Sequence, residues 1–126
     1  MLAPGFARAV FAMFLVAEVH PFSDGNGRVA RALANVELSA AGQQRLMIPI
    51  VYRDDHLYAL RAMSRLEDPK SLIKVLARAQ AWAAGVDWSS AASAEADLRR
   101  TNALLTPMEA EEQGVILRTV DELVNR

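Results

Sequence analysis

Residues 20–31 read HPFSDGNGRVAR, and the interpretation of the whole chain depends on this stretch. It places a histidine, a carboxylate, a loop bracketed by two glycines, and two arginines within twelve consecutive residues. Backbone amides at the start of a helix and arginine side chains both bind anions. The stretch therefore predicts a polyphosphate site in a loop between two helices.

The helix expected before this loop ends at the histidine. Apolar residues recur at helical spacing from Phe6 to Ala17, which predicts a mostly buried helix over residues 6–19. Pro21 cannot continue that helix, and the residue before a proline is disfavoured in the helical conformation. We therefore expect His20 at the helix end, with its imidazole directed into the loop.

A second helix is expected directly after the loop, from residue 27 or 28 to about residue 41, with Gly42 as its left-handed stop. Its apolar side is expected to carry Val29, Leu33 and Val36.

The start of this second helix supplies the groups expected to bind the anion. Gly25 and Gly27 flank Asn26, and glycines permit a positive φ and the close approach of a ligand to backbone N–H groups. Arg28 and Arg31 lie three residues apart, hence on one helix face, and their planar guanidinium groups suit two-point contacts with phosphate oxygens.

Asp24 is expected to bind a metal ion. A carboxylate beside a bound anion would be repelled unless a cation lies between them, and Mg²⁺ can share oxygens from carboxylate, phosphate and water. A calcium-binding loop starting at Asp24 is excluded, because its sixth position would be Val29 instead of glycine and its twelfth Asn35 instead of glutamate.

The stretch resembles the signature of the Fic family of adenylyltransferases, H-P-F-x-D-G-N-G-R-x-x-R, at all nine specified positions. The resemblance implies an all-α, Fic-type helical bundle with the motif loop between two core helices. Only nineteen residues precede His20, and they contain no candidate for the β-hairpin flap that docks the target in this family. We therefore expect residues 1–104 to be the C-terminal portion of a Fic domain, and residues 105–126 to be a C-terminal helix that either packs on the core or starts an appended module.

The resemblance also implies roles for the motif residues. His20 corresponds to the general base that takes the proton from a target hydroxyl, and Asp24 to the Mg²⁺ ligand. Phe22 corresponds to a buried anchor of the loop. The nucleotide-binding residues, around the phosphates of ATP, are Gly25, Asn26, Gly27, Arg28 and Arg31.

The implied activity is transfer of AMP from Mg²⁺-ATP to a serine, threonine or tyrosine hydroxyl of a target protein, with release of pyrophosphate. Alternatives are a truncated remnant that binds nucleotide or a partner without turnover, and a Fic enzyme that uses another nucleotide or removes AMP. A helical adaptor with a chance loop is a third interpretation. None of the eight glutamates follows a serine or threonine by four positions, so the family's inhibitory element is missing, lies upstream, or comes from another protein such as an antitoxin.

Composition limits the remaining possibilities. The 126 residues suffice for one modest core. A net charge of −1 gives no broad attraction to nucleic acid or membranes, and we expect neither as a partner. The chain has no cysteine, which excludes disulfides and thiolate metal sites and fits a cytoplasmic, bacterial enzyme.

The middle of the chain predicts an extended segment and two helices. Pro49 makes residues 46–52 an extended or edge segment. Helical spacing follows over residues 56–66, with Asp54 and Asp55 as caps. His56 is expected at the surface or in a cap, while Tyr58 loosely matches a family tyrosine near the adenine. Asp68 and Pro69 open the next helix, which Gly85 ends.

The last third of the chain predicts an exposed helix or hinge followed by one long helix. Residues 89–105 form an exposed helix or a hinge. Thr106, Pro107 and Glu109 make a capping box with proline at the first helical position, and the helix they open is expected to end near Asn125.

Overall fold

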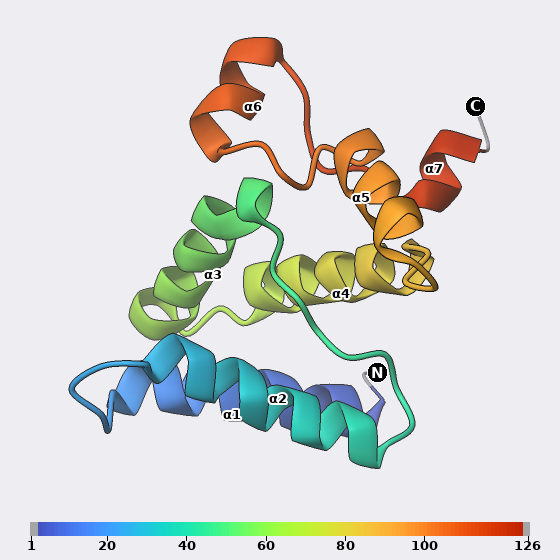
Figure 1. Cartoon of the computed structure of the whole chain (residues 1–126). Helices are drawn as coiled ribbons and strands as arrows, with labels where there is room; N and C mark the ends of the chain where they lie inside the picture. The colour runs from blue at the N-terminus through green and yellow to red at the C-terminus, as the bar shows by residue number, and fades with distance from the viewer. Residues whose placement is uncertain (1–2, 125–126) are drawn as a thin grey trace.

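The computed structural model describes residues 3–124. Within them the chain forms seven α-helices, one short 3₁₀-helix (η1) and no strand, which confirms the all-α class (Figure 1). No helix among these residues is both long and apolar enough to cross a lipid bilayer. In chain order the elements are α1 (Pro4–Val19), α2 (Asn26–Ala40), η1 (Ile50–Tyr52), α3 (Arg53–Leu66), α4 (Lys70–Gly85), α5 (Ala91–Arg100), α6 (Pro107–Gln113) and α7 (Val120–Val124).

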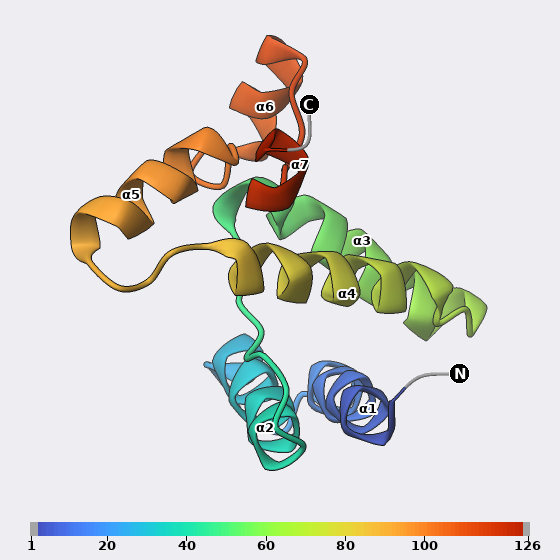
Figure 2. The ribbon, with the colours of Figure 1, turned by 90° about the vertical axis from the view of Figure 1, so that its right-hand side faces the viewer.

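Helices α1 and α2 form a closely packed antiparallel hairpin that lies beneath α3 and α4 (Figure 1, Figure 2). A side chain at Gly5 would overlap the Cβ of Ala41, so only glycine allows the two helices to approach this closely at their far end. The Arg8 Nε donates to Glu37 Oε2 at 2.8 Å across the same pair. The hairpin thus fixes the position of the loop that joins its two helices.

The buried face of α2 is not the one that its larger apolar residues predicted. Leu33 and Val36 are 44% and 62% exposed, and Val29 is only partly buried. The buried residues instead recur every fourth position, and they are Asn26, Ala30, Ala34 and Leu38. The two alanines in the middle of this face let α1 approach closely, while the larger Asn26 and Leu38 are buried toward the ends of α2.

Two hydrophobic cores lie along the chain. The N-terminal core joins α1, α2, α3 and the first half of α4, and its largest fully buried side chains are Met13, Leu38, Leu72 and Leu76. The C-terminal core joins η1 and the end of α4 to the segments that follow, and it consists of Val51, Trp82, Ala83, Val86, Ala103, Ala110 and Leu117. Helix α4 contributes to both cores and so connects them.

The segment after α2 turns at residues 41–42, has no regular secondary structure over residues 43–49 and is extended at Pro49, whereas residues 50–52, which were also expected to be extended, form η1. The Asn35 side chain holds it, because its Oδ1 accepts from the Leu46 N–H at 2.6 Å and its Nδ2 donates to the Leu46 carbonyl at 3.0 Å. Helix α3 then begins at Arg53, so the two aspartates expected as caps lie in its first turn.

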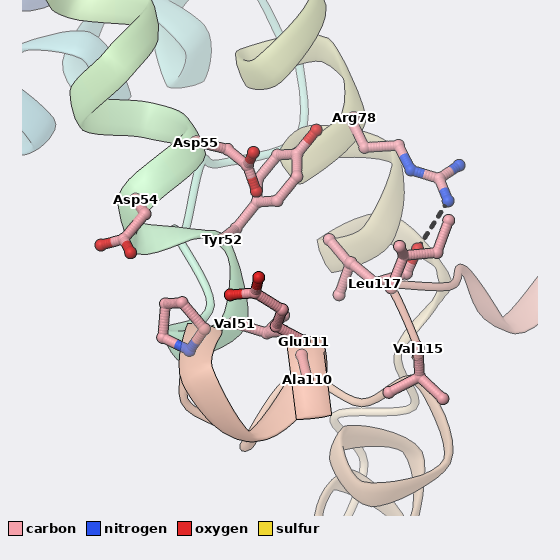
Figure 3. Close-up of a pocket in the computed structure, with 11 residues that line it drawn as sticks. Val51, Tyr52, Asp54, Asp55, Arg78, Ala110, Glu111, Val115 and Leu117 are labelled. Atoms are coloured by element: carbon pink, nitrogen blue, oxygen red, sulfur yellow. Dashed lines mark hydrogen bonds between the residues drawn. The ribbon is translucent and has the colours of Figure 1, made fainter. Parts of the chain in front are cut away.

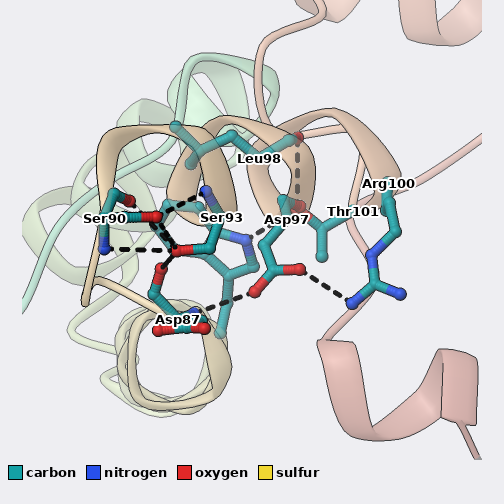
Figure 4. A network of polar contacts seen from close by, with 8 residues as sticks. Asp87, Ser90, Ser93, Asp97, Leu98, Arg100 and Thr101 are labelled. Carbon is teal, nitrogen blue, oxygen red and sulfur yellow. Dashed lines mark hydrogen bonds and ion pairs between the residues drawn. The ribbon is translucent and has the colours of Figure 1, made fainter.

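Helix α5 is fixed to the loop that follows α4 by a polar network around Asp97 (Figure 4). The Asp97 carboxylate accepts from the Asp87 N–H at 2.8 Å and from Arg100 at 2.7 Å. Ser90 and Ser93 form a reciprocal capping box at the start of α5. Of the two alternatives expected for residues 89–105, an exposed helix and a hinge, the structure therefore shows a mostly exposed helix.

The capping box at Thr106 and Glu109 is confirmed, but the helix it opens ends at Gln113 instead of near Asn125, which lies outside the described residues. Gly114 adopts φ 67° and stops α6, and α7 starts only at Val120. The intervening chain is held by Arg78 of α4, which donates to the Leu117 carbonyl at 2.8 Å and pairs with Glu122. The expected domain boundary near residue 104 stays a prediction.

Candidate functional site

His20 lies at the end of α1, as the proline after it predicted. Its backbone N–H donates to the Val16 carbonyl at 2.9 Å, and its backbone is left-handed, with φ 55° and ψ 53°. A left-handed conformation costs energy for a residue with a Cβ, and such strain is concentrated at functional sites. The imidazole is exposed and lines two adjoining pockets.

The loop after His20 is held by one buried side chain. Asn26 is the first residue of α2, and its Oδ1 accepts from the Phe22 N–H at 3.1 Å while its Nδ2 donates to the Phe22 carbonyl at 2.8 Å. The Phe22 ring, expected to be a buried anchor, is 49% exposed, so that expectation is wrong for this chain. The anchor is the backbone of Phe22, and the side-chain amide of Asn26 is fully engaged in holding it.

The two glycines have different structural reasons. Gly25 precedes α2 with φ 78°, a conformation that glycine adopts without cost. Gly27 lies inside α2, and a Cβ built on it would be 3.2 Å from Arg31 Nη1. The absence of a side chain at Gly27 therefore leaves room for the guanidinium group of Arg31.

The charged residues of the loop are open to solvent. The side chains of Asp24 and Arg28 are 95% and 77% exposed, and their nearest charged atoms are 3.9 Å apart. Asp24 Oδ1 accepts from the Gly25 N–H at 2.8 Å. Arg31 forms no ion pair with any acidic residue in the described part of the chain. Arg28 therefore has one weak, solvent-exposed acidic partner and Arg31 has none among the described residues, which leaves both guanidinium groups available to an anion.

All seven site residues predicted from the sequence lie around one depression, which we call the motif pocket. It has a volume of about 340 Å³ and also includes Ser23. The predicted residues that line it are His20, Asp24, Gly25, Asn26, Gly27, Arg28 and Arg31. The pocket brings the imidazole, the start of α2 and both guanidinium groups together, although their individual roles are still predictions.

A second pocket adjoins the first and is mostly apolar, and we call it the apolar pocket. It has a volume of about 350 Å³ and shares His20, Asn26 and Gly27 with the motif pocket. Its opposite wall comes from α3, and its residues there are Leu57, Leu60, Arg61, Ser64 and Arg65. The sequence did place Leu57 and Leu60 on a helix, but it contained no signal that this helix faces the motif loop.

His56 is neither at the surface nor in a cap, contrary to the sequence-based expectation. Its side chain lies in α3, the residue is 8% exposed, and its Nδ1 is buried without a hydrogen-bond partner. Burial, and secondarily the positive charge of Arg31, lower the pKa of the His56 imidazole to about 4. His56 is therefore uncharged at neutral pH and lies within the electrostatic influence of the motif.

Two further pockets lie away from the motif residues. Tyr58, loosely matched by resemblance to a tyrosine near the adenine, lines a pocket between α3 and α4 that is separate from the motif pocket and the apolar pocket, and its match stays a prediction. Another pocket, of about 400 Å³, separates α3 from α6 (Figure 3). Burial raises the pKa of the Tyr52 phenol there, and the neighbouring Asp55 carboxylate raises it further.

The fit of a metal ion to the motif pocket depends on Asp24. Among the described residues, no group of three or more histidine and acidic side chains gathers in one place. Mg²⁺ is usually bound by one or two carboxylates together with substrate phosphates and water. One outward-facing carboxylate beside two arginines is compatible with that mode of binding, but not with a site made of protein ligands alone.

Comparison with known proteins agrees with this geometry. Residues 2–38, which include α1, the loop and most of α2, match the model of the Fic/DOC family. The chain therefore carries a Fic segment. Its match to protein adenylyltransferase fic-1 of Caenorhabditis elegans, and equally to that of Caenorhabditis briggsae, is 34% identical over 71 residues. That match covers 56% of this chain and 14% of each relative.

A second group of relatives covers a shorter stretch. Protein adenylyltransferase Fic of Drosophila persimilis is 38% identical over 53 residues, which are 42% of this chain and 10% of the relative. The Fic segment is thus matched within proteins several times longer than the aligned region. No solved structure matches the chain.

Proposed function

We propose that this chain is part of a protein adenylyltransferase, which transfers AMP from ATP to a serine, threonine or tyrosine hydroxyl of a target protein. The observation that carries the proposal is the motif pocket, which an exposed histidine lines together with the start of a helix and two arginines, one weakly paired with Asp24 and the other without an acidic partner among the described residues. The names of the matched relatives support the same reaction.

In the proposed reaction, His20 acts as general base. The imidazole takes the proton of the target hydroxyl while its oxygen bonds to the α-phosphorus, and the bond from that phosphorus to the bridging oxygen breaks. Pyrophosphate leaves with the bonding electron pair. A positioned base contributes about 10²–10⁴ in rate. The exposure of His20 and its place at the edge of both pockets suit this role.

The remaining motif residues would bind the triphosphate. The N–H groups at the start of α2 and the helix dipole favour an anion in front of Gly25 and Gly27. Arg28 and Arg31 would hold the outer phosphates. Asp24 would hold Mg²⁺, which when bound neutralises phosphate charge. The Asn26 side chain would keep the loop in the shape that exposes these groups.

The apolar pocket is the proposed place of the nucleoside. It adjoins the phosphate-binding loop through the shared residues His20, Asn26 and Gly27. Ligand pockets are typically lined by apolar side chains with a few polar groups, and Leu57 and Leu60 with Arg61 make such a lining.

The proposal extends to regulation and setting. Arg31, which has no acidic partner among the described residues, would be the target of an inhibitory helix or antitoxin that supplies a carboxylate. We place the protein in the cytoplasm of a bacterium, in accord with a chain that lacks cysteine.

Incubation with Mg²⁺ and ATP labelled on the α-phosphate tests the proposal. We expect the chain to bind ATP, measured by calorimetry, and to label itself or proteins of an added extract. His20→Ala should retain binding and lose at least 100-fold in labelling rate. Arg99→Ala, at an exposed ion pair of α5, is the matched control and should behave as wild type.

Each outcome of this experiment decides a different part of the proposal. Absence of ATP binding would overturn the nucleotide site itself. Binding without label transfer would contradict turnover by this chain and support a nucleotide-binding remnant. Labelling that survives His20→Ala would contradict the assignment of the base.

A further inference from the structure

His56 occupies an unusual position for a polar side chain. It is 8% exposed, and its Nδ1 is buried without a hydrogen-bond partner. Leaving a buried polar atom unpaired is energetically unfavourable, and such atoms call for an explanation. An apolar side chain of similar size would fill the same buried position without leaving a polar atom unpaired.

Helical spacing places His56 one turn from the wall of α3 that lines the apolar pocket. Leu60 lies one turn after His56 on the same helix face, and it lines the apolar pocket opposite Asn26 and Gly27. On the facing helix α2, Gly27 lines the same pocket as Leu60, and Arg31 lies one turn after Gly27. Arg31 and His56 are thus each one helical turn away from a residue that lines this pocket. The charge of Arg31 accordingly acts on the His56 imidazole.

Arg31, in contrast to His56, has hydrogen-bond donors but no acidic partner among the described residues. Its guanidinium group has five N–H donors and no acceptor, and it forms no ion pair within residues 3–124. A neutral imidazole with its hydrogen on Nε2 offers Nδ1 as an acceptor. One buried acceptor without a donor therefore lies near a donor group without an acceptor.

The chemistry of the position favours a neutral acceptor over a charged one. A buried carboxylate beside Arg31 would form an ion pair and compete with the phosphates for the guanidinium group. A lysine or arginine would repel it. A neutral imidazole can orient the guanidinium group and leave its positive charge available to an anion.

We propose that His56 is a positioning residue for Arg31, whose guanidinium group donates to His56 Nδ1 when a polyphosphate is bound. The inference rests on the proposed function, because it assumes that Arg31 binds phosphate. It adds a residue from α3 to the site, outside the motif and before the residues that line the apolar pocket.

Two substitutions of His56 separate shape from hydrogen bonding. His56→Phe keeps a planar ring and removes the acceptor, whereas His56→Asn places an amide oxygen close to the position of Nδ1. With inorganic tripolyphosphate as the probe, calorimetry should show about tenfold weaker binding for His56→Phe and recovery to within about threefold of wild type for His56→Asn. In an Arg31→Ala background, His56→Phe should have no further effect.

The outcomes distinguish this inference from the proposed function. If wild type binds tripolyphosphate and all His56 variants bind equally well, the role of His56 is refuted and the phosphate site stands. If wild type binds none, both fail. If His56→Phe weakens binding equally without Arg31, the coupling is refuted.

A measurement on the unsubstituted protein covers the case in which a variant does not fold. The ¹⁵N resonance of His56 Nδ1 should have the shift of an unprotonated ring nitrogen at pH 7 and should move when tripolyphosphate is added. A protonated Nδ1, or a resonance unchanged by saturating tripolyphosphate, would overturn the inference.

Discussion

The loop before α2 and the segment around α5 use polar residues in opposite ways. Around α5, Asp97, Thr101 and Trp82 are buried, and each has hydrogen-bond partners within the protein. In the loop, Asp24 and Arg28 are exposed and 3.9 Å apart, and Arg31 forms no ion pair in the described chain. Satisfied polar groups stabilise a fold, whereas groups left open can bind a ligand. Within the loop, Asn26 is the exception, because its buried side chain is hydrogen-bonded to the Phe22 backbone.

Trp82 should give the largest change in stability. It is 1% exposed, donates from Nε1 to Thr101 Oγ1 at 3.0 Å, and meets the Trp88 ring edge-on. Trp82→Ala should lower the free energy of unfolding by about 3–5 kcal/mol, measured by urea denaturation. Trp88→Ala, at a half-exposed ring, is the matched control and should cost less. Equal losses for both would contradict the central place of Trp82 in the C-terminal core.

Acidification should reveal the buried imidazole of His56 in α3, the helix that lies across the apolar pocket from the loop. The pKa of His56 is about 4 in the folded protein and about 6.5 when unfolded, so between these values the unfolded chain binds more protons. Stability should therefore fall as pH drops from about 6.5 to 4, by about 3 kcal/mol in total. His56→Phe should abolish this loss in urea titrations at several pH values. An unchanged pH dependence would show that the imidazole is solvated.

A separate loss of stability is expected at lower pH, and it arises from the ion pair between Arg78 and Glu122 in the C-terminal region. Hydrogen bonding to Arg78 lowers the pKa of Glu122 to about 2, so the stability contributed by this pair is lost as pH falls from about 4.5 toward 2. Glu122→Gln should remove this acid-induced loss and leave the His56 window unchanged. The two variants therefore assign each pH range to one region.

The two hydrogen bonds from the Asn26 side chain to the Phe22 backbone, which we call the clamp, should have a smaller effect on stability than on ATP binding. Asn26→Ala removes both hydrogen bonds to the Phe22 backbone and should cost about 1–2 kcal/mol in urea denaturation. Because the loop then loses its fixed shape, ATP affinity should fall by about tenfold or more. Ser90→Ala removes a comparable cap at α5 and is the control, with a similar loss of stability and unchanged ATP affinity. Equal ATP binding in both variants would refute a role of the clamp in the site.

Local signals in the sequence predicted local structure well. The end of α1 at His20, the capping box at Thr106 and the positive φ of Gly42 depend on neighbouring residues, and all three are confirmed. The motif stretch also predicted which seven residues share a pocket, because they belong to one loop and the helix after it.

Features set by tertiary packing were predicted less well. The buried face of α2 is chosen by the close approach of α1, which selects small side chains over the larger Leu33 and Val36. The break at Gly114 was missed because the capping box and the apolar spacing after it fit one continuous helix. His56 and the α3 wall of the apolar pocket depend on how α3 packs on the hairpin, and the spacing of residues 56–66 carries no such information.

The clamp by Asn26 also affects the chemical stability of the chain, namely its rate of deamidation. Asparagine followed by glycine is the pair most prone to deamidation, because the next backbone nitrogen can close a ring onto the side-chain amide. Here both polar atoms of that amide are tied to Phe22, and the residue has already entered a helix, so ring closure is hindered while the fold persists. Once the chain unfolds and an aspartate forms, refolding would set a carboxylate oxygen against the Phe22 carbonyl. Damage of this kind would be retained after the chain cools or is returned to native buffer.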